Sequence, residues 1–290
     1  MAALALVAVP TALAPADSPS DLNWTAVLPA DPDASGPRQR AVRGCRRATV
    51  RCVVVEARRL AALQRRFRCD HRGVFATTYL ELTREVLVTV RRNPRYFRFP
   101  AYFFREDALF ANVYFRAVRA WHAGHRVPPA WRIAFETARD ADVNGAQDML
   151  LGINAHVQND MPFVLASLGL RTERGRSRKR DHDAMNAVLD RAYERVVRAV
   201  ERRYDPAVSA TNSPLTPLDD VAGIELVREW RERVWRNAER LVEAENGAER
   251  RRIAADIQQY AAGWARSIAS FEVHGYRAER DAYCRQRLGS

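Results

Sequence analysis

The stretch Leu150-Leu-Gly-Ile-Asn-Ala-His-Val-Gln-Asn-Asp-Met-Pro-Phe163 places two ionisable residues inside an otherwise apolar helical segment. His156 and Asp160 lie four residues apart, so they share one helix face and both side chains can reach a common point. Burying such a pair costs free energy unless its members bond each other, a metal ion or a substrate. The stretch therefore predicts a buried helix that carries a polar site.

Pro162 stands in the interior of this predicted helix. Its ring clashes with the carbonyl group of Gln158, and it has no backbone N–H to donate. We therefore expect a kink beside His156 and Asp160 that frees a carbonyl group close to the pair. In the alternative, the helix ends at Met161 and Pro162 opens a second one.

On both sides of this stretch the chain reads as one helix after another, without an alternating strand series or a glycine-rich phosphate loop. The expected helices are Val53–Arg68, Val74–Arg92, Pro100–His122, a shorter helix from Pro128, Ala146–Leu168, a helix capped by Asp181 or Asp183, Val221–Ala244 and Glu249–Arg287. The prediction is an all-α fold, with a single bundle of about eight helices over residues 49–290. Residues 1–48, rich in Pro and Ala, are expected to be a disordered leader.

The chain of 290 residues has the composition of an ordinary globular protein, with 47% hydrophobic and 28% charged residues, and it carries a net charge of +12. Lys179 is the only lysine among its 47 basic residues, so nearly all of them are arginine. Arginine suits phosphate and nucleic-acid contacts. A GC-rich genome explains the same bias, and the spread of the arginines among acidic residues favours that explanation.

Cysteine usage and hydropathy bear on the compartment. The four cysteines, at positions 45, 52, 69 and 284, form no paired CxxC motif and do not suggest a disulfide scaffold, so we expect reduced thiols. The alternative is a zinc set of Cys45, Cys52, Cys69 and His71. No apolar run is long enough to span a membrane. We expect a soluble cytoplasmic protein, with secretion as an alternative because the N-terminus is apolar.

The pair His156/Asp160 has the spacing by which a helix offers an imidazole and a carboxylate to one metal ion. The competing interpretation is a structural pair in which the two side chains bond only each other. Asp107 lies in an aromatic setting that is unusual for a solvated carboxylate. Asp183 and Asn186, at i and i+3 on a later helix, are further candidates, although Asp183 also fits a helix N-cap.

Several segments together resemble a known family. They are Gly73–Thr83, Phe110–Phe115, Trp131–Phe135, Gly152–Pro162 and Asp183–Asn186. With the signature N-A-H-x-x-x-D-[LM]-P, they resemble an actinobacterial family of all-helical proteins of unknown function, over roughly residues 53–270. The resemblance implies an all-α fold and supplies no activity. It marks as signature positions Asn154, His156, Asp160, Asp183 and Asn186. Gln158 departs from the family, which is expected to have asparagine there.

The HxxxD spacing is also distantly similar to that of helical zinc-dependent phospholipases C and single-strand nucleases. With six histidines, the chain lacks the extra ligands that a trinuclear zinc cluster needs. The similarity leaves room for a single divalent ion, zinc or magnesium, held by His156, Asp160 and Asp183.

Three functions follow as hypotheses. The leading one is an enzyme, either a metal-dependent hydrolase or a lyase or cyclase of secondary metabolism, that acts on a small or lipid-like substrate. His156 is then a ligand or general base and Asp160 its partner. The expected substrate-binding residues are Asp107, Tyr114, Asn154, Asn186 and Trp131. The second hypothesis is a non-catalytic ligand-binding or interaction protein whose polar cluster is structural. The third, least favoured, is nucleic-acid binding through arginines at 38–72 and 171–180; the oligomeric state is left open.

Overall fold

The computed structural model describes residue 45 and residues 47–208 and 220–288, and these ranges contain helices and no strand. In chain order the helices are α2 (Val50–Phe67), α3 (Arg72–Arg92), α4 (Pro100–His122), α5 (Pro129–Asp140), α6 (Gly145–Ile153), the π-helix η1 (Asn154–Asp160), α7 (Met161–Leu168), α8 (Lys179–Tyr204), α9 (Asp220–Glu243), α10 (Gly247–Ala269) and α11 (Tyr276–Leu288). Since α6, η1 and α7 follow one another directly, they form one long segment. Counting α6–η1–α7 as one, the described residues therefore form nine helical segments, which confirms the all-α fold.

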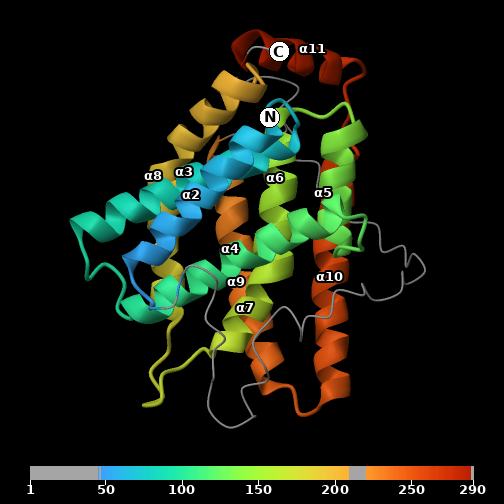
Figure 1. The fold of residues 1–290 in the computed structure, drawn as a ribbon. Helices are drawn as coiled ribbons and strands as arrows, with labels where there is room; N and C mark the ends of the chain where they lie inside the picture. Colours follow the sequence, from blue (N-terminus) through green and yellow to red (C-terminus); the bar gives the residue numbers. More distant parts are fainter. Residues whose placement is uncertain (1–44, 46, 209–219, 289–290) are drawn as a thin grey trace, which may run out of the picture.

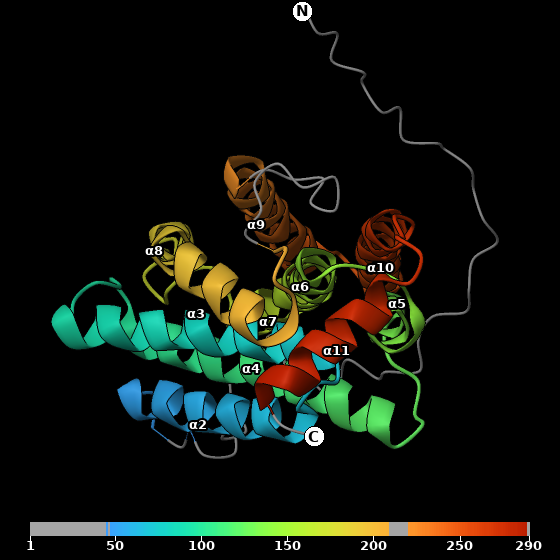
Figure 2. The ribbon, with the colours of Figure 1, turned by 90° about the horizontal axis from the view of Figure 1, so that it is seen from above.

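The long segment α6–η1–α7 lies at the centre of the molecule. Figure 1 shows α6 and α7 end to end along the long axis beside α10. Viewed from above, α6 is surrounded by α3, α8, α9, α10 and α5, while α2 lies on the outer side of α3 and α4 (Figure 2). Every residue of α7 is buried. An apolar helix without a polar face is stable only inside a protein, so composition accounts for its central place.

Local sequence explains where several helices begin. Pro100 and Pro129 stand in the first turns of α4 and α5, where a missing N–H costs nothing. Asn144 and Gln147 form a capping box at the start of α6, with bonds of 2.8 and 3.0 Å between each side chain and the other residue's backbone N–H. Asn246 caps α10 in a similar way, accepting from a backbone N–H one turn later.

Two predicted helix boundaries are wrong. The single helix expected over Glu249–Arg287 is broken at residues 270–275 and becomes α10 and α11. Gly275, directly before α11, adopts φ of +82°, which a continuous helix does not allow. Neither Asp181 nor Asp183 caps α8, which begins at Lys179. The buried carboxylate of Asp181 instead accepts the backbone N–H groups of Arg98 and Phe99 at 2.7 Å each, just before α4. The predicted leader, residues 1–48, lies almost wholly outside the described residues.

The expectation of reduced cysteines is also wrong. Cys45 is bonded to Cys52, and Cys69 is bonded to Cys284 across 215 residues of sequence. All four thiols are consumed, so the alternative zinc set with His71 fails as well. The second disulfide fastens the end of α2 to α11, a pairing that residue spacing did not reveal.

The hydropathy of the helices bears on membrane association. Within the described ranges, no helix combines the length and the apolar character that crossing a bilayer requires.

Candidate functional site

The signature stretch neither ends at Met161 nor breaks at Pro162. Residues Asn154–Asp160 widen into the π-helix η1, and the backbone N–H of Met161 bonds to the carbonyl group of His156. Pro162 then falls in the first turn of α7, where its missing N–H is tolerated. The disruption of α-helical hydrogen bonding expected beside Pro162 therefore takes the form of a wider turn that carries both predicted site residues, and π-turns of this kind are frequent at functional sites.

His156 and Asp160 form a buried pair, with exposed fractions of 2% and 0%. The Nδ1 atom of His156 lies 3.0 Å from Oδ2 of Asp160. The same oxygen accepts the indole N–H of Trp131 at 2.9 Å, and Oδ1 accepts the side-chain amide of Asn159 at 2.7 Å. Burial raises the pKa of the Asp160 carboxyl, while these three donors oppose that rise. The carboxylate is thus held in place from three sides.

The imidazole of His156 is uncharged at neutral pH, because burial lowers its pKa although Asp160 acts in the opposite direction. Its Nδ1–H then donates to Asp160, which leaves a lone pair on Nε2. That Nε2 atom is buried and has no hydrogen-bond partner among the residues that the structure describes. The ring stacks on Phe110 with centroids 3.5 Å apart and an interplanar angle of 3°. The side chain is therefore fixed in orientation, with one basic nitrogen unused.

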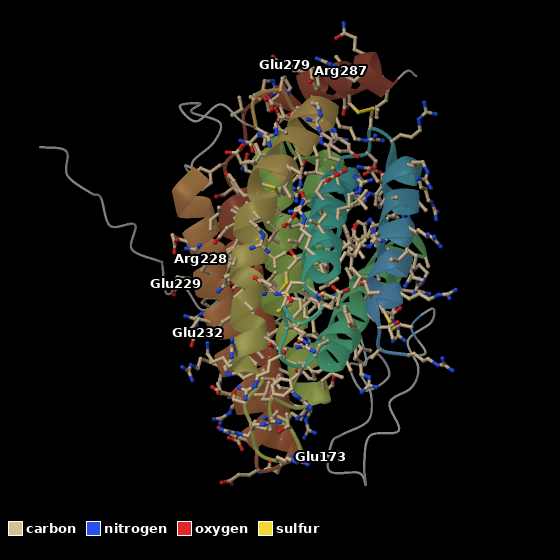
Figure 3. The ribbon with its side chains drawn as sticks, turned by 90° about the vertical axis from the view of Figure 1, so that its left-hand side faces the viewer. Glu173, Arg228, Glu229, Glu232, Glu279 and Arg287 are labelled. Atoms are coloured by element: carbon tan, nitrogen blue, oxygen red, sulfur yellow. A yellow bond between two sulfur atoms is a disulfide. The ribbon has the colours of Figure 1, made fainter. Side chains whose placement is uncertain are left out.

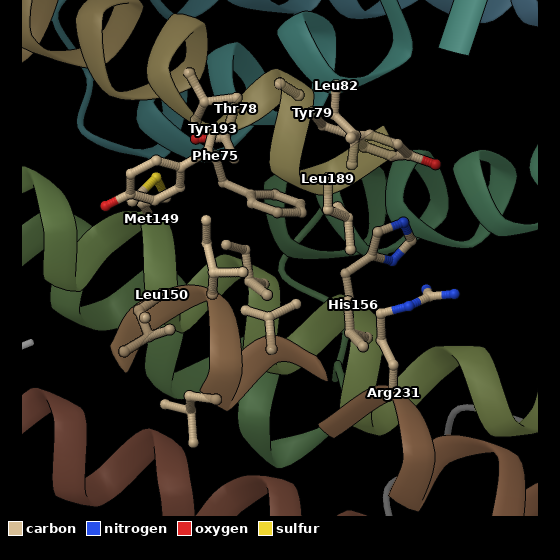
Figure 4. Close-up of a pocket in the computed structure, with 18 of the residues that line it drawn as sticks. Phe75, Thr78, Tyr79, Leu82, Met149, Leu150, His156, Leu189, Tyr193 and Arg231 are labelled. Carbon is tan, nitrogen blue, oxygen red and sulfur yellow. The ribbon is translucent and has the colours of Figure 1, made fainter. Parts of the chain in front are cut away.

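His156 lines a cavity of about 670 Å³. Most of the cavity wall is apolar and comes from α3, α6, α8 and α9, including Leu82, Val86, Met149, Leu150, Leu189 and Val196. Figure 4 shows His156 and Arg231 on one side of the cavity, opposite Met149 and Tyr193. A cavity of this size and lining suits a small, largely apolar molecule.

The wall formed by α8 and α9 reaches the surface of the molecule. There Arg228 on α9 pairs with Asp190 on α8 at 2.6 Å. Figure 3 shows Arg228 with Glu229 and Glu232 on the outer side of α9. Because Arg228 also lines the cavity, this ion pair lies where a ligand could pass between α8 and α9.

Acidic side chains line the end of the cavity that holds His156. Asp107 lies in hydrogen-bonding contact with the buried Glu56, and burial raises the pKa of both carboxyl groups. Glu106 is also buried, and burial raises its pKa to about 8 against the effect of Arg231. Tyr79, whose ring centroid is 5.0 Å from that of His156, has a buried hydroxyl group that finds no hydrogen-bond partner in the described ranges.

Arg231 supplies the positive charge near these carboxyl groups. Its Nε donates to Oδ1 of Asn186 at 2.7 Å, and another nitrogen donates to the backbone oxygen of His182. A third contact joins it to the sulfur of Met161 at 3.8 Å. Burial lowers its pKa only to about 10, so the guanidinium stays charged at neutral pH, with its nitrogens already engaged.

The predicted substrate-binding residues take different places. Asp107 lines the cavity, while Asn186 holds Arg231, which lines it. Trp131 donates to Asp160, and Tyr114 stacks on Trp131 with ring centroids 5.4 Å apart. Neither of these two residues lines the cavity. Asn154 donates to the carbonyl group of Ala261 at 2.8 Å and so ties η1 to α10. Gln158, where asparagine was expected, donates to Asn154 at 2.9 Å.

The predicted metal ligands His156, Asp160 and Asp183 do not form a ligand set. Asp183 lies at the exposed start of α8, where it pairs with Lys179 at 2.8 Å. Both oxygens of Asp160 are occupied by donors. No group of three His, Cys, Asp or Glu side chains in the described part of the chain is arranged to hold a metal ion. These residues therefore do not fit the expected zinc or magnesium ion.

Four site residues escaped sequence reasoning, namely Glu56, Tyr79, Glu106 and Arg231. Glu56 follows directly on Val53–Val55, and Glu106 lies beside Asp107 in the aromatic helix, so an acidic residue in an apolar stretch was an available signal. Tyr79 and Arg231 carry no such signal, since aromatic residues and surface-like arginines are common on amphipathic helices.

The arginines predicted to contact nucleic acid are only partly described. Residues 38–44 and 46 lie outside the described ranges. In the second segment, Arg178 turns inward and donates to the carbonyl groups of Leu168 and Gly169 at 2.9 and 2.8 Å. Arg178 therefore acts as a structural tie, and nucleic-acid binding remains a prediction.

Comparisons with known proteins place these residues in one family. A sequence model described as "Family of unknown function (DUF5995)" matches residues 54–271. The matched span contains every site residue named above and ends before α11. Neither the curated proteins nor the solved structures contain a match to the chain.

Proposed function

The chain belongs to this family of unknown function, and from the geometry of its site we propose that it is an enzyme that uses His156 as a general base. The substrate is a small, largely apolar molecule that enters the cavity of about 670 Å³. His156 removes a proton from the bound molecule, and Asp160 orients the imidazole and stabilises it once it is charged.

The observation that carries this proposal is the unused Nε2 atom of His156. A buried imidazole nitrogen without a partner costs free energy unless a bound molecule pairs with it. His71 and His182 also have one buried ring nitrogen without a partner in the described part of the chain, but neither lines the cavity, whereas His156 does. Here Nδ1 is bound to a carboxylate that three donors hold, while Nε2 is left free at the cavity wall. The proposed proton transfer uses no metal ion, because Asp160 orients the imidazole and stabilises its charged form.

The second candidate is a ligand-binding protein without catalysis. The nearly continuous apolar lining favours it, because such a lining suffices to hold a lipid-like molecule. The two candidates differ in rate: an enzyme accelerates proton removal from a bound carbon acid, whereas a binding protein leaves that rate at its value in solution.

The disulfides also bear on the compartment. Two bonds that consume all four cysteines favour an oxidising compartment over the cytoplasm that the sequence led us to expect.

Chemical modification tests the proposed base in the unmodified full-length protein. Diethyl pyrocarbonate acylates uncharged imidazoles, and peptide mapping by mass spectrometry identifies the modified residue. We expect His156 to react, with a pH midpoint below the ordinary imidazole value of 6.5, because burial lowers the pKa of His156. N-phenyl-1-naphthylamine, a neutral apolar probe, should occupy the cavity and protect His156 alone.

The variant Asp160→Asn provides the matched comparison. An amide has one acceptor oxygen, so it cannot accept from Asn159 as well as from Nδ1–H and the Trp131 indole, as the carboxylate does. When its NH2 group turns toward Nδ1, the other tautomer of His156 becomes populated and the modification slows. A wild-type His156 that stays unmodified while His125 and His274 react would contradict the proposal.

A further inference from the structure

Polar atoms that have no hydrogen-bond partner within the described part of the chain gather at the His156 end of the cavity. Besides Nε2 of His156, they include the hydroxyl group of Tyr79 and Oδ2 of Asp107, both on residues that line the cavity. Tyr79 is 6% exposed and His156 is 2% exposed. Figure 4 shows the Tyr79 hydroxyl on the same side of the cavity as His156 and Arg231. Such unpaired buried atoms call for a ligand group that pairs with them.

The unpaired atoms are of two kinds. Nε2 of His156 accepts a proton, whereas the phenol of Tyr79 donates one. Asp107 also acts as a donor, because burial raises the pKa of its carboxyl group; its Oδ2 atom carries the proton while its other oxygen accepts from Glu56, whose pKa is raised as well. Glu56 does not line the cavity, so it acts as a positioning residue: its hydrogen bond lowers the pKa of Asp107, against the effect of burial, and occupies one oxygen so that the other faces the cavity. One acceptor therefore faces two neutral donors.

This arrangement matches the demands of enolisation. A base must meet the hydrogen on a carbon atom while neutral donors meet the oxygen on which negative charge develops. We propose that Tyr79 and Asp107 hold the carbonyl oxygen of an apolar, unsaturated ketone or aldehyde while His156 removes a proton from the neighbouring carbon. This inference rests on the base role proposed above for His156.

The proton balance closes without a co-reactant. The C–H bond breaks, its proton moves to Nε2 of His156, and its electron pair forms the carbon–carbon double bond of an enolate. The carbonyl electrons move to the oxygen, which accepts from Tyr79 and Asp107. His156 then returns the proton to a more distant carbon of the conjugated system. The net reaction is an isomerisation in which a double bond shifts.

The surroundings favour a neutral carbonyl group over a carboxylate. Arg231, the nearby cation, already has its nitrogens engaged with Asn186, His182 and Met161. A carboxylate would face Asp107 and Glu106, whose protons it would have to share. A carbonyl oxygen needs only the two neutral donors, and the remaining apolar wall covers the rest of the molecule.

The donor set can be tested by binding of 2-naphthol, whose absorption distinguishes its neutral form from its anion, with naphthalene as the probe that lacks the oxygen. In the full-length protein at pH 7 we expect bound 2-naphthol to be largely anionic and to bind at least about tenfold more tightly than naphthalene. Tyr79→Phe and Asp107→Asn should each lose the anion band and about tenfold in affinity, with naphthalene binding unchanged. Tyr193→Phe, at the opposite end of the cavity, is the matched control.

The outcomes separate the two proposals. If naphthalene binds but 2-naphthol binds no more tightly and stays neutral, the donor set is overturned and the apolar cavity stands. Tighter binding of 2-naphthoate than of 2-naphthol would overturn the carbonyl assignment in favour of a carboxylate. If neither naphthalene nor 2-naphthol binds, both this inference and the proposed function fail.

Catalysis is tested by exchange of the α-hydrogens of 2-tetralone in D₂O, followed by NMR. We expect exchange faster than in buffer, its loss in His156→Gln, and a roughly 10²-fold decrease in Tyr79→Phe and Asp107→Asn. Glu56→Leu should shift the alkaline limb of the pH profile to higher pH, since Asp107 then loses the hydrogen bond that lowers its pKa. Exchange that requires His156 but not Tyr79 or Asp107 would overturn the donor set alone.

Discussion

Glu106 shows how the surroundings of one side chain set its charge. The residue lies on α4, is 7% exposed, and lines the cavity near Arg231. Burial raises the pKa of its carboxyl group from 4.5 to about 8, although Arg231 acts in the opposite direction. In the folded protein the group therefore stays protonated at pH 7, whereas in the unfolded chain it is ionised.

This difference makes stability depend on pH. Because the folded pKa is raised, the folded state binds more protons than the unfolded state between pH 4.5 and about 8, so stability falls as pH rises through that window. Glu106→Gln removes the titration. We expect the free energy of unfolding of the variant, minus that of the wild type, to rise by at least ~2 kcal/mol across the window.

Urea denaturation at a series of pH values measures this difference. Glu272→Gln, at an exposed position between α10 and α11, is the control for the exchange of a glutamate for a glutamine. A flat or falling difference for Glu106→Gln would show that Glu106 is ionised in the folded protein and paired with Arg231.

Among the helices, α6 and α3 approach each other so closely that only glycine fits at their contact. A Cβ atom at Gly152 would lie 2.3 Å from the ring of Phe75, which is buried and packs edge-on against His156 at 5.8 Å. Gly152 thus allows α3 to present Phe75 to the site.

Gly152→Ala should push the Phe75 ring into the cavity. Because the ring is buried, we expect a loss of about 1–3 kcal/mol in stability, together with weaker binding of N-phenyl-1-naphthylamine. Gly263→Ala, in α10, has open space around the added methyl group and should instead gain about 0.5–1 kcal/mol. Thermal unfolding and probe fluorescence check both effects. Equal behaviour of the two variants would contradict this account of the contact.

Over the whole molecule, α11 closes one end of the helical assembly through buried polar contacts. Arg280 is 1% exposed; it pairs with Asp148 at 2.8 Å, lies 3.5 Å from Asp205, and donates to the backbone oxygen of Val143 at 2.5 Å. The disulfide Cys69–Cys284 fastens the same helix to the end of α2. Both ties join segments far apart in the sequence.

Arg280→Met should destabilise the protein by about 3–5 kcal/mol, because it leaves the carboxylates of Asp148 and Asp205 buried without their cation. Arg285→Met, on the exposed side of α11, should change stability by less than about 0.5 kcal/mol. Guanidinium denaturation of both variants measures the difference. An effect of Arg280→Met no larger than that of Arg285→Met would mean that the buried network contributes nothing to holding α11.

Local patterns in the sequence were enough to predict the all-α fold, the bounds of α4 and the buried pair His156/Asp160. Helical periodicity, a proline in a first turn and an ionisable pair in an apolar stretch all arise within a few residues. Their physical causes, backbone hydrogen bonding and burial of one face, act over the same short distance.

The rest of the site came from contacts between distant segments. The side chains that converge on His156 come from α2, α3, α4 and α9. The break before α11 is held by Asp142, which accepts backbone N–H groups from Gly275 and Arg277. Asp183, a signature residue, points away from the site. Such placements depend on how the helices pack. Because packing energy is shared among many residues far apart in the chain, no short stretch of sequence predicts them.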